Sequence, residues 1–305
     1  MNQKKYLLIT LSVITVCSNI FAQTDSSDKK KSYFKANLNY LSNAVYFGRK
    51  DSAAVPYLRT SLGYYDKSGF YISTGAAMLV SPNETKRIDL INVDAGYNFS
   101  LNKLDVSLNA SKFFYSNASF AVGSELKGLA GVNAGYYIGS ISVNGGAEAL
   151  FTSNIDYSTS FGLSHPFESG EENKKLTINP TVQLNAGTQY FNEAYYEFRK
   201  YSFTTSNSGS GSTSKGKGRG HSNTGNTGTT STTVKSVTFY DKNRFTILDY
   251  ELSLPVNYDA KSWGAYLLPV LAIPTNPANF AIDNVIQKEK LSTAFFAEIG
   301  AYIKF

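Results

Sequence analysis

The sequence predicts an all-β protein whose antiparallel, up-and-down strands close into a membrane-spanning β-barrel of about twelve strands, with ten or fourteen as alternatives. Three observations predict this fold. Apolar and polar residues alternate along many segments, these segments are roughly 10 to 15 residues long, and aromatic residues recur near the segment ends. Beyond the N-terminal segment, no apolar run is long enough to cross a membrane as a helix.

The alternation is clearest in residues 176–190 and 155–164. One parity of the first segment is apolar, and the other carries Thr177, Asn179, Thr181, Gln183, Asn185, Gly187 and Gln189. Residues 104–111, 141–151 and 250–258 repeat the pattern. A period of two places alternate side chains on opposite faces of a sheet. Each segment therefore has one face suited to lipid and one suited to water.

A soluble β-sandwich would show the same alternation, so the segment length and the aromatic residues have to decide between the two folds. Strands of soluble sheets average about 5 to 6 residues, whereas tilted membrane strands need roughly 9 to 11. Aromatic residues on the apolar faces near segment ends match the girdles that flank the apolar band of a membrane barrel. These residues are Tyr97, Phe99, Tyr136, Phe151, Tyr190 and Tyr258.

The pattern predicts strands at residues 33–46, 55–65, 69–80, 87–100, 103–115, 125–138, 140–152, 155–165, 175–190, 244–258, 262–274 and 292–305. An even number places both ends of the barrel on the periplasmic side. The connections after strands 2, 4, 6 and 10 are short, as periplasmic turns are, and those after strands 5, 9 and 11 are long. Residues 165–174 depart from this rule, because they make a longer connection on the short-turn side.

The N terminus predicts export. Residues 1–22 combine Lys4 and Lys5 with an apolar run and end on Ala22, which is typical of a cleaved signal peptide. Residues 23–32 then form a short N-terminal segment, and residues 33–305 form the barrel. The single cysteine, Cys17, lies within the signal peptide, so the exported chain contains no thiol for disulfides, catalysis or metal binding. Its net charge of about +4 requires no anionic partner.

The closing segment carries the most specific pattern. One face holds Ala297, Ile299, Ala301, Ile303 and the terminal Phe305, and the other holds Glu298, Gly300, Tyr302 and Lys304. Here the chain resembles bacterial outer-membrane β-barrel proteins, including the porin-like barrels of unassigned function. The resemblance implies an outer-membrane location, the lipid bilayer as a partner, and Phe305 as part of the signal that the barrel assembly machinery reads.

Three prolines and one insertion interrupt the pattern. Pro180, Pro255 and Pro269 each remove a hydrogen-bond donor from neighbouring strands, which predicts a bulge or a weakly paired patch near their periplasmic ends. Residues 192–243 form a long extracellular loop whose middle, 204–236, is low in complexity and too polar to form a core. A basic ligand contact is the alternative role for this loop, and nucleic-acid binding is not expected because aromatic residues do not interleave its basic residues.

The sequence does not indicate a catalytic function. His165 and His221 are the two histidines, and in a strand the adjacent Ser164 and His165 point to opposite faces, which prevents a Ser–His pair. The glycines are spread through strands and form no phosphate-binding loop followed by a helix. We therefore expect no catalytic residue, no metal site and no cofactor. An outer-membrane hydrolase remains the third functional alternative.

The polar parity of the strands predicts a charged lumen. The expected lumen-lining residues are Lys35, Arg59, Asp94, Asp105, Glu148, Asp156, Asp249, Glu251, Glu298 and Lys304. They permit either a plug of ion-paired side chains or a narrow, cation-leaning path for polar solutes. The leading function is a porin-like passive channel for small polar solutes. The alternative is a non-conducting surface barrel that binds a partner or serves a larger envelope assembly.

Overall fold

The computed structural model describes residues 31–51, 54–81, 85–117, 119, 121–171, 173–193, 237–282 and 284–305. The expected signal peptide, nearly all of residues 23–32 and the low-complexity segment 204–236 lie outside these ranges. No helix within the described ranges combines the length and the apolar character needed to cross a bilayer.

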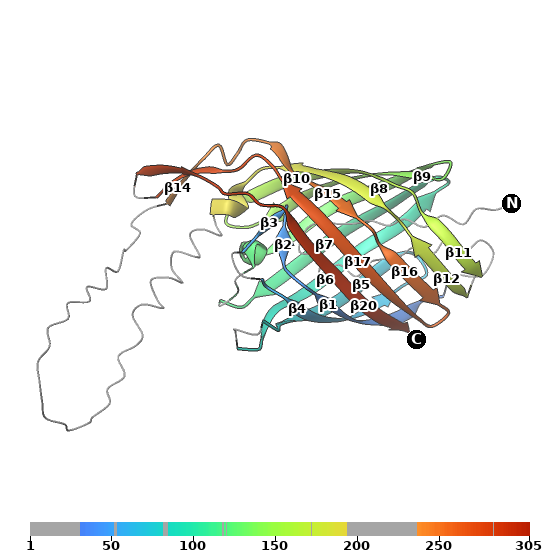
Figure 1. The fold of residues 1–305 in the computed structure, drawn as a ribbon. Coiled ribbons are helices and arrows are strands. Elements are labelled where there is room, and N and C mark those ends of the chain that lie inside the picture. The colour runs from blue at the N-terminus through green and yellow to red at the C-terminus, as the bar shows by residue number, and fades with distance from the viewer. Residues whose placement is uncertain are drawn as a thin grey trace, which may run out of the picture.

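One large sheet closes on itself, because the last strand pairs with both the first strand and β17 (Figure 1). Its strands are β1 (Tyr33–Leu41), β4 (Tyr57–Tyr65), β5 (Phe70–Leu79), β6 (Arg87–Leu101), β7 (Leu104–Tyr115), β8 (Gly128–Ile138), β9 (Ile141–Phe151), β10 (Ile155–Ser164), β11 (Phe167–Glu171), β12 (Lys174–Ile178), β13 (Thr181–Gly187), β15 (Thr246–Ser253), β16 (Val256–Ala260), β17 (Trp263–Pro274) and β20 (Ala294–Lys304). Three membrane crossings each consist of two of these strands: β10 with β11, β12 with β13, and β15 with β16. The fifteen strands therefore make twelve crossings, and the barrel has the twelve strands that the sequence predicts.

All neighbouring strands are antiparallel and nearly all follow one another in the chain. The two ends of the barrel differ. One end, which we call the turn end, holds Tyr33, Phe305 and tight turns such as those at Asn102 and Gly139, both of which adopt positive φ angles. Glycine and asparagine tolerate that conformation better than other residues. The other end, which we call the loop end, carries the long connections. The turn end corresponds to the periplasmic side of a membrane barrel.

Two of the three prolines interrupt the strands in which the sequence places them. Pro180 separates β12 from β13, and Pro255 separates β15 from β16, whereas Pro269 stays within β17. The carbonyl oxygens of all three prolines still accept backbone hydrogen bonds, from His165, Asn179 and Leu254, at 2.9–3.2 Å. The expected patch is therefore a line of strand breaks that crosses adjacent strands.

The irregular connection at residues 165–174 is a continuation of the barrel wall. After a break at His165 and Pro166, β11 pairs with β12 from Phe167 opposite Ile178 to Glu171 opposite Lys174, and β12 pairs with β16. Residues 165–174 therefore depart from the turn rule because they contain an additional strand, β11, which extends the barrel wall.

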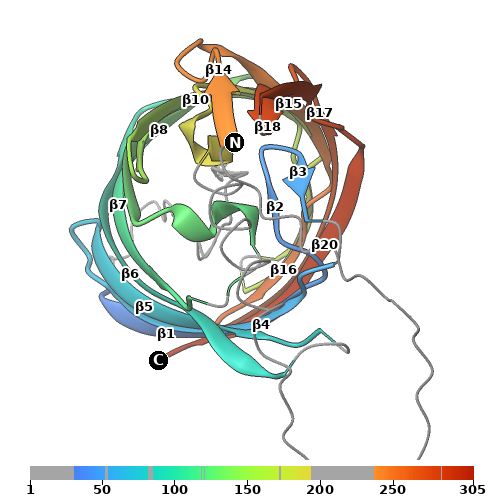
Figure 2. The ribbon, with the colours of Figure 1, turned by 90° about the vertical axis from the view of Figure 1, so that its left-hand side faces the viewer.

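Three expected strands are shorter than the pattern predicts, because their loop ends leave the wall. β1 ends at Leu41 rather than at residue 46, β8 begins at Gly128 rather than at 125, and β13 ends at Gly187 rather than at 190. The chain that follows or precedes them forms β2 (Val45–Tyr46), β3 (Arg49–Lys50), the 3-10 helix η1 (Val122–Glu125) and a helical turn that begins at Tyr190. Figure 2, seen from the loop end, shows β2, β3 and the helical segments inside the ring of strands.

A second, three-stranded sheet lies at the loop end. It consists of β14 (Val237–Tyr240), β18 (Asn279–Ile282) and β19 (Val285–Lys288), all antiparallel. β14 ends the expected extracellular loop 192–243, and β18 and β19 belong to the connection between β17 and β20 (Figure 1).

The two faces of the barrel differ in chemistry. Outward positions are exposed and apolar along the wall, as at Leu62, Val132, Phe161, Leu252 and Ile299, which are 40–57% exposed. The residues between them are buried and mainly polar. A closed sheet with an apolar outer face is the arrangement that satisfies backbone hydrogen bonding inside a bilayer, because it leaves no unpaired strand edge in the lipid.

Candidate functional site

The inner face of the barrel holds all ten residues for which the sequence predicts a lumen position. Lys35, Arg59, Asp94, Asp105, Glu148, Asp156, Asp249, Glu251 and Glu298 are at most 9% exposed, and Lys304 is partly buried. Their placement follows from the period of two, because the neighbouring residues on each strand point outward. The structure does not bring them into one cluster but distributes them over eight strands of the wall.

A compact ion pair joins β4 to β20 near the middle of the wall. The guanidinium of Arg59 contacts Glu298 through Nη2 and donates from Nε to Asn39 Oδ1 at 2.8 Å. The second carboxylate oxygen of Glu298 accepts a hydrogen bond from the Tyr266 hydroxyl at 2.6 Å. Each charge therefore has a partner, as a buried ion pair requires if it is not to destabilise the fold.

The turn end of the same wall is lined by lysines and tyrosines. The ammonium of Lys35 lies 4.1 Å from the ring centre of Tyr302, and that of Lys304 lies 5.1 Å from it. The Tyr302 hydroxyl donates a hydrogen bond to Asp259. The inner face at β1, β4 and β20 therefore carries the three cations Lys35, Arg59 and Lys304, accompanied by two carboxylates.

The remaining wall carries carboxylates held by neutral groups. Asp94 on β6 accepts hydrogen bonds from Ser73, at 3.3 Å, and from Asn92. On β15, Asp249 accepts one from Asn185 Nδ2 at 2.8 Å. Asp105, Glu148 and Glu251 lie on β7, β9 and β15. The inner face is thus electrostatically uneven. Three cations lie on the adjacent strands β4, β1 and β20, a fourth, Lys175 on β12, lies opposite Asp259 on β16, and most of the carboxylates lie on the other strands.

Glycines on the inner face receive aromatic rings that lie along the wall. A Cβ atom at Gly264 would lie 2.5 Å from the ring of Tyr302, and one at Gly300 would lie 2.7 Å from the ring of Tyr266. The ring of Tyr71 occupies the corresponding place over Gly96. Any larger residue at these glycines would push the ring away from the wall, so the glycines allow tyrosines to pack flat against it.

The loop-end part of the lumen is filled by an apolar plug, which the sequence did not predict. We define the plug as residues 42–51 and 54–56, residues 119 and 121–127, and the helical turn at 190–193. Its side chains pack against barrel residues in one buried cluster: Leu41, Ala44, Tyr46, Phe47, Val55, Tyr57, Ala77, Leu79, Leu90, Phe113, Ala121, Val122, Leu126, Leu129, Leu150, Phe191 and Leu248. Tyr46 packs edge-on against Phe47 and Phe191, with ring centres 4.7 and 4.8 Å apart. Burial raises the pKa of the Tyr46 phenol well above its ordinary value, and the carboxylates of Asp156 and Glu148 raise it further.

Arg49 fixes the first plug segment. Its guanidinium donates to the carbonyl oxygens of Phe47 and Leu248 at 3.0 and 3.4 Å, and to those of Thr275 and Asn276 at 3.3 Å. Nε lies 3.1 Å from Glu289 Oε1 in a buried ion pair, and Glu289 also accepts from the Ala278 backbone N–H at 3.0 Å. Arg49 therefore ties the plug to β15 and to the connection between β17 and β20.

Two buried aspartates fix the other plug segments. Asp89, turned inward by a bulge in β6, accepts hydrogen bonds from Ser119 at 2.7 Å, from Arg87 at 2.9 Å and from the Tyr57 hydroxyl. Asp156 accepts from the Thr188 hydroxyl at 2.6 Å and from the backbone N–H groups of Tyr190 and Phe191 at 2.8 Å. Asp156 was predicted to line the lumen, but it is fully buried and serves as an anchor for the third plug segment.

Ser164 and His165, the adjacent residues considered as a catalytic pair, have separate surroundings. Ser164 is buried on the inner face, where Asn144 Nδ2 donates to its hydroxyl at 3.3 Å, and the His165 ring packs against Phe167 with ring centres 4.5 Å apart. His221 lies outside the described residues. Within the described ranges, no group of three or more histidine, cysteine, aspartate or glutamate side chains is placed to hold a metal ion.

No protein-family model and no curated protein matches the sequence. Solved structures with a similar architecture include the NanC porin, at 8% identity over 89% of this chain and 100% of that chain with a TM-score of 0.42, and the KdgM porin, at 9% identity over 89% and 99% with a TM-score of 0.41. LpxR from Salmonella typhimurium is similar at 10% identity over 89% and 100%, with a TM-score of 0.43. The assignment of the chain rests on its own closed wall and apolar outer face. The protein is an outer-membrane β-barrel.

Proposed function

We propose that the protein is a gated outer-membrane channel for small polar solutes, with a preference for cations, and that the plug closes it at the extracellular end. The single observation that carries this proposal is the division of the lumen. Polar and charged side chains cover the inner face from the middle of the barrel to the turn end, whereas at the loop end apolar side chains of loop segments pack against apolar side chains of the strands inside the wall. Loops are the parts of a barrel that can move without breaking strand pairing.

The charges on the inner face support the preference for cations. Carboxylates on β6, β7, β9 and β15 outnumber the cations on β1, β4 and β20, and each of these three cations lies near Asp259 or Glu298. A path with charged walls and low-dielectric surroundings concentrates ions of opposite sign. A passing cation would therefore meet favourable potential along most of the wall.

Conductance across a planar bilayer tests the proposal. The unaltered protein should show rare or brief openings, whereas a variant with residues 44–55 replaced by a short glycine-containing turn should conduct steadily. The matched control replaces residues 204–236, a low-complexity segment that is not part of the plug, by a similar turn and should fold and conduct like the unaltered protein. A correctly folded variant without residues 44–55 that never conducts would exclude a gated channel.

The second candidate is a non-conducting surface barrel that binds a partner. It is favoured by the outer sheet, where β19 leaves Val285 and Ile286 60% and 75% exposed. In that case removal of the plug would leave conductance absent, and removal of β18 and β19 would abolish capture of the partner in a pull-down.

We further propose that Phe305 belongs to the segment that the barrel assembly machinery reads. Its backbone N–H donates to Phe34 O at 3.0 Å, and its carbonyl oxygen accepts from Phe34 N at 2.8 Å. Its ring is 66% exposed and stacks on Phe34 at 5.9 Å between ring centres. The residue thus joins the two strands at which the barrel closes and remains accessible from outside.

A further inference from the structure

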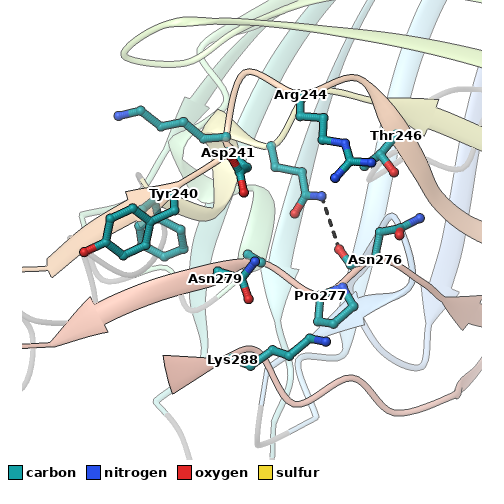
Figure 3. Close-up of a pocket in the computed structure, with 12 residues that line it drawn as sticks. Tyr240, Asp241, Arg244, Thr246, Asn276, Pro277, Asn279 and Lys288 are labelled. Atoms are coloured by element: carbon teal, nitrogen blue, oxygen red, sulfur yellow. Dashed lines mark hydrogen bonds between the residues drawn. The ribbon is translucent and has the colours of Figure 1, made fainter. Parts of the chain in front are cut away.

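A small polar pocket lies at the loop end, between the turn after β14 and the β18–β19 hairpin (Figure 3). Its volume is about 180 Å³. Pockets for drug-sized ligands are roughly 300 to 1,000 Å³, so this one has room for a single small group. Its lining includes Tyr240, Asp241, Lys242, Arg244, Asn279 and Lys288.

The pairing of the outer sheet places three different side chains in a row along the pocket. Tyr240 is opposite Asn279, and Asn279 is opposite Lys288. Directly paired residues of antiparallel strands point to the same face, and all three side chains are exposed. The row therefore offers an aromatic ring, an amide and an ammonium side by side.

Contacts among neighbouring residues fix two sides of the pocket. Phe239 and Phe280 stack with ring centres 5.3 Å apart and form a small apolar cluster with Ala278. On the other side, Gln189 Nε2 donates to the Asn276 carbonyl oxygen at 3.2 Å, the bond drawn in Figure 3. The same oxygen accepts from Arg49. Prearranged groups lose less entropy on binding, which favours a specific ligand site.

Positive charge predominates in the pocket. Arg244 and Lys288 are exposed and make no side-chain ion pair with the described residues, whereas Lys242 is bound to Glu193 at 2.6 Å. Asp241 is the acidic residue among the lining side chains. Arginine and lysine beside a pocket favour carboxylate or phosphate oxygens, to which they donate charge-assisted hydrogen bonds.

We propose that this pocket binds one terminal sugar unit that carries a carboxylate or a phosphate. The sugar ring packs on Tyr240, the Asn279 amide contacts the hydroxyl groups, and the anionic group lies between Arg244 and Lys288. Such a unit is found both on outer-leaflet glycolipids and on free saccharides, and the same chemistry recognises it in either form.

Calorimetric titration of the full-length protein in detergent tests the proposal, with glucose 6-phosphate and galacturonate as acidic probes and glucose and galactose as neutral ones. We expect the acidic probes to bind at least tenfold more tightly than the neutral ones, with an affinity that falls as salt screens the charges. The double variant Arg244→Gln, Lys288→Gln should weaken the binding of the acidic probes at least tenfold. Lys290→Gln, which removes a charge from the same connection but outside the pocket, should leave it unchanged.

A second experiment separates the two sources of the ligand. For the same variants, we measure how much of the protein is retained by vesicles that contain lipopolysaccharide and how much by vesicles of phosphatidylcholine alone. Loss of retention in the double variant, without binding of free sugars, assigns the pocket to a glycolipid, and binding of free acidic sugars assigns it to soluble saccharides. Equal binding of acidic and neutral probes, an equal effect of Lys290→Gln, or no binding in either experiment would overturn the proposal. The heat-dependent gel shift of each variant shows that it is folded.

Discussion

Charged residues inside this barrel serve two different purposes. Arg59, Glu298 and their neighbours satisfy one another across the wall, whereas Arg49, Asp89 and Asp156 each hold a loop segment in the lumen. Sequence position does not separate the two groups, because an inward charge on a strand has the same spacing whether its partner is a side chain or a loop. Asp156 shows this, since it has the parity of a lumen residue and the contacts of an anchor.

Removal of one partner from the Arg59–Glu298 pair should destabilise the barrel. In Glu298→Ala the guanidinium stays buried without its carboxylate, which costs about 3–5 kcal/mol. We expect a lower urea midpoint in lipid vesicles, followed by the gel shift between folded and unfolded bands. Glu148→Gln, which alters a buried carboxylate without an ion pair to a described residue, is the control and should change the midpoint far less. Equal midpoints for Glu298→Ala and the unaltered protein would show that solvent screens the pair.

At the scale of elements, alternation predicts the strands well and the loops poorly. A period of two identifies each crossing, and the prolines identify where crossings break, because both effects act within the strand itself. Residues 43–47 continue an apolar pattern past Leu41, yet they fold into the lumen. An apolar segment can form either a membrane strand or a buried plug, so its composition does not distinguish the two structures. Two signals were present, the Tyr46-Phe47 pair in a connection and Gly48, whose positive φ allows the β2–β3 turn.

The plug segment should loosen when its main anchor is removed. Arg49→Ala deletes hydrogen bonds to four carbonyl oxygens and leaves Glu289 buried beside an empty space, so the closed position loses stability relative to the open one. We expect openings in planar-bilayer recordings to become at least tenfold more frequent, the change that about 1.4 kcal/mol produces. Lys50→Ala, at the adjacent exposed position, is the control. If both variants open as rarely as the unaltered protein, Arg49 does not hold the gate.

The closing strand should depend on its last residue during assembly. Phe305→Ala removes the exposed ring at the junction of β1 and β20, and we expect the yield of folded barrel in the outer membrane to fall severalfold. Ile299→Ala removes a similarly exposed apolar side chain from the middle of β20 and is the matched control. The measurement is the ratio of the heat-modifiable band to total protein in membrane fractions. Equal yields for both variants would remove the assembly role of Phe305.

For the whole molecule, the alternation of apolar and polar residues predicts both the closed wall and the inward position of the charged side chains. It does not predict the loop segments that pack inside the lumen. Whether a twelve-stranded barrel is open depends on which loops fold inward, and that depends on contacts between residues far apart in the chain, such as Arg49 with Glu289. The sequence therefore left an ion-paired interior and a narrow path as alternatives. The structure shows a third arrangement, in which polar side chains face the lumen and loop segments pack apolar side chains inside its loop end.

The preference for cations is a property of the whole lumen and should be measured in an open form. In the variant that lacks residues 44–55, a salt gradient should produce a reversal potential of the sign given by cation selectivity. Neutralising Glu148 and Glu251 together, as Glu148→Gln and Glu251→Gln, should move that potential towards zero, because fewer fixed carboxylates concentrate fewer cations along the path. Lys261→Gln, which alters an exposed residue at the turn end, should have a smaller effect. High salt should reduce the difference between the variants, since the Debye length falls from about 10 Å at 0.1 M to about 3 Å at 1 M. A conducting protein whose reversal potential is unchanged by the double substitution would show that these two carboxylates do not select the permeating ion.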